Sequence, residues 1–191
     1  MWKRILLALA VLLAILLVVV ATRPSTYRVE RSATAAAPAD VVYAQIADFH
    51  RWAAWSPWEK LDPGMKKTFE GPAMGQGAGY HWSGNDKVGE GSMTVTSARP
   101  GEQVVIRLEF LKPWASTNTT TFQLAPEGGG TRVAWIMEGH NDFMGKAVTL
   151  FMDMDKMIGA DFERGLAQLK SVAEAETAKG APAPTARAPG D

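Results

Sequence analysis

The chain has 191 residues, with 20 basic and 20 acidic side chains and no cysteine. The lack of cysteine excludes disulfide bonds, thiol catalysis and cysteine-based zinc sites. Without Lys3, Arg4 and Arg23, 17 basic residues stand against 20 acidic ones and form no basic stripe, which argues against nucleic-acid binding.

The N-terminal segment is apolar enough to enter a membrane. Residues 5–21 form an unbroken apolar run of 17 residues with basic residues on both sides, close to the roughly 20 residues that cross a bilayer as a helix. We therefore predict a transmembrane anchor at residues 1–23. A cleaved signal peptide is the alternative, with Val19-Val20-Ala21 as a tolerable cleavage site, although the run exceeds a typical signal core.

The orientation of this segment is weakly determined, because the basic residues before and after it nearly balance. Bacterial N-terminal segments of this length usually leave the amino end inside. We therefore expect a single-pass protein of the cell membrane, with its domain on the exported, periplasmic or extracytoplasmic side.

A single domain is expected over residues 24–175. Residues 26–36 alternate as a strand does, and Val42, Ile46 and Phe49 follow at helical spacing. The stretch RWAAWSPWEK (51–60) then holds three tryptophans, and Pro57 predicts that a short helix stops at or before Ser56. These indoles either fill a core or line the mouth of an apolar cavity.

Strand patterns dominate the middle of the chain. After a turn at residues 62–64 comes a short strand, and from residue 75 to 140 five or six alternating segments follow one another through turns rich in Gly, Pro or Asn. This order predicts a meander of antiparallel strands. The glycine-rich residues 71–79 lack the context of a nucleotide-binding motif and are interpreted as a flexible loop beside the cavity mouth.

A long amphipathic helix closes the domain. Apolar residues recur at steps of three or four from Ala147 to Leu169, and Asn141 or Asp142 can cap the helix. Residues 176–191 form a tail rich in proline and alanine that we predict to be disordered. The whole order indicates an α+β fold in which a curved antiparallel sheet surrounds a long C-terminal helix.

The space between sheet and helix is the candidate ligand cavity, since a curved sheet often does not close fully on one helix. Ten large side chains are expected to line this cavity: Trp55, Trp58, Tyr80, Trp82, Met93, Phe110, Trp135, Met137, Phe151 and Met154.

Three stretches, WSPWEK, WSGN and MDMDKMIGADFE, resemble the SRPBCC superfamily in the branch labelled polyketide cyclase/dehydrase and lipid transport. The resemblance covers roughly residues 26–172. It implies a helix-grip fold with an apolar cavity that binds a hydrophobic small molecule or a lipid. It carries over no catalytic motif, because the superfamily holds enzymes, carriers and sensors.

Titratable residues offer weak alternatives. Glu138, His140 and Asp142 are a thin ligand set without a second histidine, so we predict a strand end and a helix cap there and no metal site. His81 alternates with Tyr80 and Trp82 and is expected on the outer face of the sheet. Asp153 and Asp155 are expected on a solvated face. No cofactor motif is present.

Three functions remain open at this point. The first is a membrane-anchored carrier or sensor of an apolar ligand, without catalysis. The second is an enzyme of the cyclase or hydratase kind, which needs a titratable pair such as Glu138 with His81 or Tyr80. The third is an interaction module with a collapsed cavity, whose exposed Trp55 and Trp58 dock a partner. The expected partners are the ligand and the membrane, and the oligomeric state is undetermined.

Overall fold

The computed structural model, which describes residues 1–180, has a seven-stranded antiparallel sheet with helices packed on one side. Along the chain come α1 (Trp2–Thr22), β1 (Thr26–Ala35), α2 (Ala39–Ala47), the 3-10 helix η1 (Phe49–Ala54), β2 (Lys66–Glu70), β3 (Gly79–Ser83), β4 (Glu90–Arg99), β5 (Gln103–Lys112), β6 (Ser116–Glu127), β7 (Gly130–His140), α3 (Phe143–Val148) and α4 (Met154–Gly180). The strand order is β1-β7-β6-β5-β4-β3-β2.

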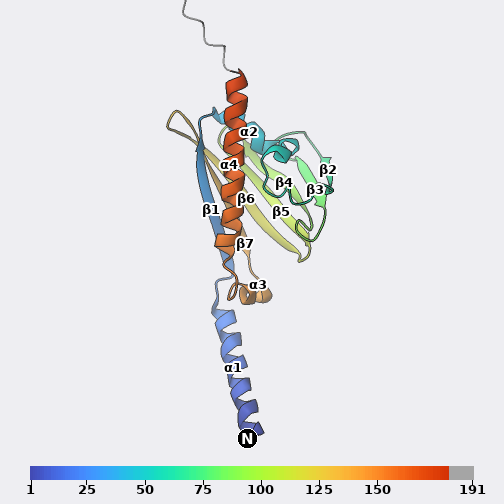
Figure 1. Ribbon diagram of the computed structural model, residues 1–191, viewed down its shortest axis with the longest axis vertical. Helices are drawn as coiled ribbons and strands as arrows, with labels where there is room; N and C mark the ends of the chain where they lie inside the picture. Colours follow the sequence, from blue (N-terminus) through green and yellow to red (C-terminus); the bar gives the residue numbers. More distant parts are fainter. Residues whose placement is uncertain (181–191) are drawn as a thin grey trace, which may run out of the picture.

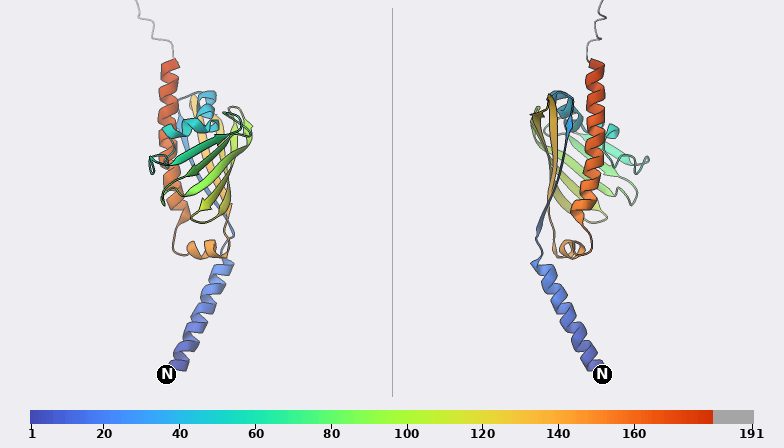
Figure 2. Two further views of the ribbon diagram at one scale, coloured as in Figure 1. Left: turned by 90° about the vertical axis from the view of Figure 1, so that its right-hand side faces the viewer. Right: turned by 60° about the vertical axis from the view of Figure 1, so that its left-hand side comes forward.

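The sheet bends around α4, as the three views in Figures 1 and 2 show. Strand β5 shows which face of the sheet is buried. Val104 and Ile106 point to the inner face and are buried, whereas Arg107 points to the outer face and is exposed. Helix α4 lies along β1 and contacts α2 and η1. The expected helix-grip fold, with its curved antiparallel sheet, long C-terminal helix and apolar N-terminal helix, is confirmed.

Two of the three neighbouring tryptophans belong to the core. The indole N–H of Trp52 donates to the carbonyl oxygen of Ile46 at 2.9 Å, and that of Trp55 donates to the carbonyl oxygen of Gln45 at 3.0 Å. Both rings contact Phe122 and Trp135 edge-on. These bonds and contacts fasten η1 to α2 and to the sheet.

The expected single helix after the sheet is two helices, which is a correction. Asp142 caps α3 by accepting the Gly145 N–H at 2.7 Å. Helix α4 starts only at Met154, where the Asp153 side chain accepts the Lys156 N–H at 3.1 Å. Asp153 is thus a capping residue, since such side chains satisfy the free N–H groups of a first turn.

At its other end, α4 runs to Gly180, five residues beyond the expected domain boundary. The helical residues 176–180 correct the prediction of a disordered tail that begins at residue 176. Residues 181–191, the remainder of that tail, lie outside the described residues.

The start of α4 is held to β1 by Arg31. Its guanidinium donates to Asp155 at 3.0 Å and to Glu163 at 2.9 Å. The hydrogen bond from Arg31 lowers the pKa of Asp155 below its ordinary value. Arg31 therefore positions the first three turns of the helix over the sheet.

Helix α4 approaches the core closely at Gly165. A Cβ there would lie 2.7 Å from Cζ3 of Trp135 and 3.1 Å from Cδ of Pro57. Alanine favours a helix by about 1 kcal/mol over glycine, but forced overpacking costs about 1–3 kcal/mol. We expect Gly165→Ala to lower the free energy of unfolding by about 1–2 kcal/mol in urea denaturation.

Gly159→Ala is the matched control, because its new Cβ meets the end of the Arg31 side chain, which can move. We expect a smaller loss there, since surface ion pairs contribute at most about 1 kcal/mol. Equal losses for the two variants would contradict close packing at Gly165.

Helix α1 is long and apolar enough to cross a membrane, a test that a signal sequence near the N-terminus also passes. Only Arg23, Pro24 and Ser25 separate α1 from β1, and α1 packs against α3. The end of α1 is therefore close to one end of the sheet.

Candidate ligand-binding cavity

A cavity of about 330 Å³ lies between the concave face of the sheet, α4 and the segment after η1. Its deep wall consists of buried residues that include Trp82, Met93 and Trp135. Lys87 and Ser116, which are exposed, mark its mouth. The protein's own side chains therefore do not fill the interior. The remaining volume is at the lower end of the range for small-molecule sites, which starts at about 300 Å³.

Eight of the ten side chains proposed from the sequence border this cavity: Trp58, Tyr80, Trp82, Met93, Phe110, Trp135, Met137 and Met154. Trp55 does not border it, because its side chain is fully buried behind Trp52 and against Phe122. Phe151 does not border it either, because it lies in the break between α3 and α4 and is 84% exposed. Both placements correct the sequence prediction.

Sequence reasoning missed other residues of the wall, notably Tyr27, Leu108, Asn118, Thr120 and Ile158. Asn118, Thr120 and Phe122 alternate along β6 and are all buried. This alternation along β6 was the feature of the sequence from which Asn118 and Thr120 could have been predicted to line the cavity. It is weak, because threonine and asparagine at inward positions look like residues of a solvated face.

A hydrogen-bonding group lies on the sheet side of the cavity. The Tyr27 hydroxyl donates to Oδ1 of Asn118 at 2.8 Å. Asn118 and Thr120 are both buried in the wall. These two side chains therefore place an amide and a hydroxyl group in an otherwise mostly apolar wall, where the polar atom of a ligand would find hydrogen-bond partners.

A second polar group lies beside the tryptophan segment. The Tyr80 hydroxyl donates to Oε1 of Glu59 at 3.2 Å, and the Glu59 carboxylate forms an ion pair with Lys67. Burial, reinforced by the negative charge of Glu59, raises the pKa of Tyr80 above its ordinary value. Tyr80 therefore remains a neutral hydrogen-bond donor at any physiological pH.

Burial also raises the pKa of Tyr27 and Tyr43, so all three tyrosines of the chain are shifted upward. At pH 10 the unfolded chain should have about half of its tyrosines ionised, and the folded protein far fewer. We expect ultraviolet titration to detect this difference in tyrosinate absorbance. The folded state binds more protons than the unfolded state in this range, so stability should fall as the pH rises above about 10.

In Tyr80→Phe, the free energy of unfolding should fall less steeply as the pH rises above about 10, because the variant lacks one of the three tyrosines with a raised pKa. A folded protein whose tyrosines all titrate near pH 10 would contradict the burial of these hydroxyls.

The titratable pair expected for an enzyme does not form. Glu138 is exposed and bound to Arg28 at 2.7 Å, and His81 is exposed with its Nε2 3.4 Å from Glu70. Neither borders the cavity. Asp142 caps α3, and among residues 1–180 no group of three or more His, Asp or Glu side chains is placed to hold a metal ion.

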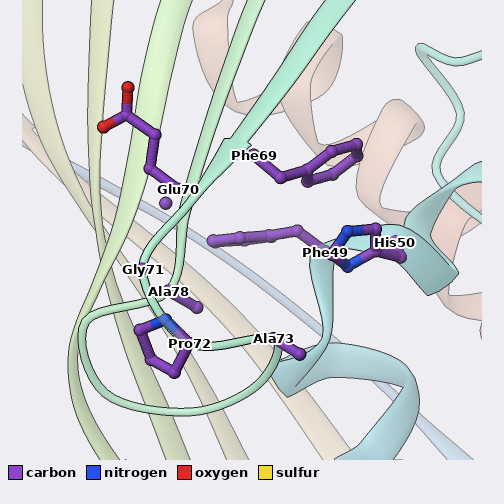
Figure 3. A pocket seen from close by; sticks show the side chains of 9 residues that line it. Phe49, His50, Phe69, Glu70, Gly71, Pro72, Ala73 and Ala78 are labelled. Atoms are coloured by element: carbon purple, nitrogen blue, oxygen red, sulfur yellow. The ribbon is translucent and has the colours of Figure 1, made fainter.

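The glycine-rich loop between β2 and β3 lies against α2 and η1 (Figure 3), and none of its residues borders the large cavity. The Gly75 N–H donates to the carbonyl oxygen of Ala47. A smaller pocket of about 220 Å³ opens there between Phe49, Phe69 and the loop, and the His50 ring stacks on Phe69 with centroids 4.0 Å apart. The loop does not line the cavity mouth, which corrects the expectation.

Comparisons with known proteins agree with this architecture. A family model described as polyketide cyclase / dehydrase and lipid transport matches residues 26–174. A search of the curated proteins found no match.

Solved structures share the fold at low sequence identity. A crystal structure of a Chromobacterium violaceum protein is 20% identical, with a TM-score of 0.56 over 80% of this chain and 99% of that one. The Aha1 protein of Colwellia psychrerythraea, solved as a dimer, is 17% identical, with a TM-score of 0.56 over 78% and 96% of the two chains. Ara h 8.0201 is 10% identical, with a TM-score of 0.51 over 81% and 99%.

Proposed function

The chain belongs to the polyketide cyclase/dehydrase and lipid transport family of the SRPBCC superfamily, and from this premise we propose that it binds a hydrophobic small molecule or lipid in its cavity. The observation that carries the proposal is the space of about 330 Å³ beside the aromatic and methionine side chains of the concave face. Burial of an apolar ligand there gains about 25 cal/mol per Å².

The ligand proposed is amphipathic, with an apolar body and at least one hydrogen-bonding group. Because its O–H donates to Glu59, the neutral Tyr80 hydroxyl offers a ligand its oxygen as an acceptor on one side. Asn118 and Thr120 supply polar atoms on the sheet side. The carboxylate of Glu59 is already balanced by Lys67. A neutral or weakly polar head group therefore fits this cavity better than a free ion.

The protein is proposed to act as a membrane-anchored carrier or sensor. Helix α1 has the length and composition of a membrane span, and the domain is proposed to lie on the exported side. The Trp-rich edge needed by an interaction module is not exposed, because Trp52 and Trp55 are buried and Trp58 is half-buried.

Native mass spectrometry tests the binding proposal. The full chain is purified from the membranes of its host in mild detergent, and its bound molecules are extracted and identified. We expect an apolar molecule at close to one per chain. If nothing co-purifies and a panel of fluorescent lipids shows no binding, the proposal fails.

A second candidate function is catalysis on an apolar substrate in the same cavity. It is favoured by the contact between the Tyr80 hydroxyl and Glu59, because the two titratable groups meet at the cavity wall. Tyr80→Phe and Glu59→Gln distinguish the candidates. A carrier should change only its affinity for the ligand, whereas an enzyme should lose turnover of a bound substrate in single-turnover experiments.

A further inference from the structure

Exposed apolar side chains gather on one end of the domain. Among residues 23–180, eleven large apolar side chains are exposed, and eight of these lie in two segments, 111–114 and 143–157. Three of them stand far out in solvent: Met144 is 68% exposed, Trp114 is 83% exposed and Phe151 is 84% exposed. We name the exposed apolar side chains of these two segments the apolar rim.

The two segments of the apolar rim lie at the end of the sheet where α1 joins it. Thr26 at the start of β1 pairs with His140 at the end of β7, and α3 follows directly. The pair Phe110 and Ser116 closes the turn between β5 and β6 at the same end. Figures 1 and 2 show α3 beside the end of α1, with the tip of β5 and β6 at the same end of the sheet.

The length of α1 determines how far this end can be from a bilayer. Its 21 residues extend about 31 Å at 1.5 Å per residue, which matches a hydrocarbon core of about 30 Å. The three residues that lead to β1 reach at most about 10 Å. Since α3 also packs against α1, the rim falls within reach of the lipid head groups.

The cavity mouth lies at this end too. Phe110 and Ser116, beside the β5–β6 turn, border the cavity, and so do Met154 and Ile158 in the first two turns of α4. Apolar side chains of β5 and α4 thus lie at the opening, together with the polar Lys87 and Ser116. Exposed apolar side chains gathered at one end of a domain are typical of a contact with a membrane or another protein.

We propose that the apolar rim docks on the surface of the bilayer that α1 spans, so that the cavity mouth faces the lipid. This inference rests on the proposed function in one respect, because it takes α1 as a retained anchor. Tryptophan prefers the interface between water and hydrocarbon, and Trp114 at the tip of the β5–β6 turn is placed to enter it. A lipid ligand then passes between bilayer and cavity without crossing water.

The absence of cysteine makes a direct test possible, since a thiol-reactive dye labels only an introduced residue. Trp114→Cys and Phe151→Cys place an environment-sensitive nitrobenzoxadiazole dye on the rim. Ala178→Cys places it at the far, exposed end of α4 as the control. Each full-length variant is reconstituted into vesicles of phosphatidylethanolamine and phosphatidylglycerol, and intact mass measurement checks that residues 1–23 are retained.

We expect the two rim labels to emit at shorter wavelength than the control label and to be quenched by brominated lipid, while the control is not quenched. Rim labels that behave like the control overturn the inference. So does a blue shift without bromolipid quenching, because the rim is then covered by protein such as a second copy. Loss of residues 1–23 also overturns it.

Extraction of bound molecules from the same preparations keeps the two proposals apart. Quenched rim labels on chains with empty cavities support docking and count against ligand binding. Unquenched rim labels on chains with a bound ligand support ligand binding and count against docking.

Discussion

Leu108→Trp should abolish most ligand binding without unfolding the protein. Leu108 is half-buried on the concave face of β5, where it borders the cavity between Met93 and Asn118 on the neighbouring strands. A larger ring there extends into empty space. If it displaces about 100 Å² of ligand surface, binding weakens by about 2.5 kcal/mol, or roughly 70-fold in Kd. Direct titrations with the neutral fluorescent probe N-phenyl-1-naphthylamine measure this change.

Arg107→Trp is the matched control, because it adds the same ring to the same strand on the opposite, exposed face. We expect its Kd to stay within a factor of two or three of the unmodified protein, and the free energy of unfolding of both variants to change by about 1 kcal/mol or less. If the two variants bind equally well, the probe does not occupy the cavity. If both lose binding, a surface site is responsible.

The fold could be predicted largely from periodicity. The alternation of Val104, Ile106 and Leu108 on β5 directed these residues to one face, and that face is the buried one. The steps of three and four residues that end at Leu169 likewise predicted a helix against the sheet. Such patterns are reliable because burial of one face decides which register is stable.

The helix break at residues 149–153 could not be predicted in the same way. Apolar spacing continues through Leu150 and Phe151, yet the chain ends one helix at Val148 and caps the next with Asp153. A capping aspartate and a solvated aspartate look alike in sequence. This is why Phe151 was placed in the cavity and is instead on the apolar rim.

The candidate cavity was predicted better than the roles of its tryptophans. Large residues on inward strand positions led to Tyr80, Trp82, Met93 and Met137, which border the cavity. The three-residue spacing of Trp52, Trp55 and Trp58 says only that they are near one another. Which ring faces the cavity depends on the 3-10 turn of η1 and on packing against β6 and β7, neither of which is visible in the local sequence.

Trp55→Ala should have the largest effect on stability. The side chain is fully buried among Trp52, Phe122 and Trp135, and its N–H donates to the carbonyl oxygen of Gln45. Removal of a buried tryptophan costs about 3–5 kcal/mol, and a carbonyl group left without its donor adds to this cost. Because domains are stable by only about 5–15 kcal/mol, the variant should be near its unfolding limit. Urea denaturation of the full chain in detergent measures the loss.

Trp58→Ala separates the core role from the cavity role. Trp58 is half-buried in the cavity wall, edge-on to Trp135 and Phe162, so we expect a loss of stability of about 1–2 kcal/mol together with weaker probe binding. Trp55→Phe should keep most of the packing, losing about 1–2 kcal/mol with the hydrogen bond, and should bind the probe normally. If Trp55→Phe weakens binding as much as Trp58→Ala does, Trp55 contacts the ligand and the division between core and cavity wall drawn here is wrong.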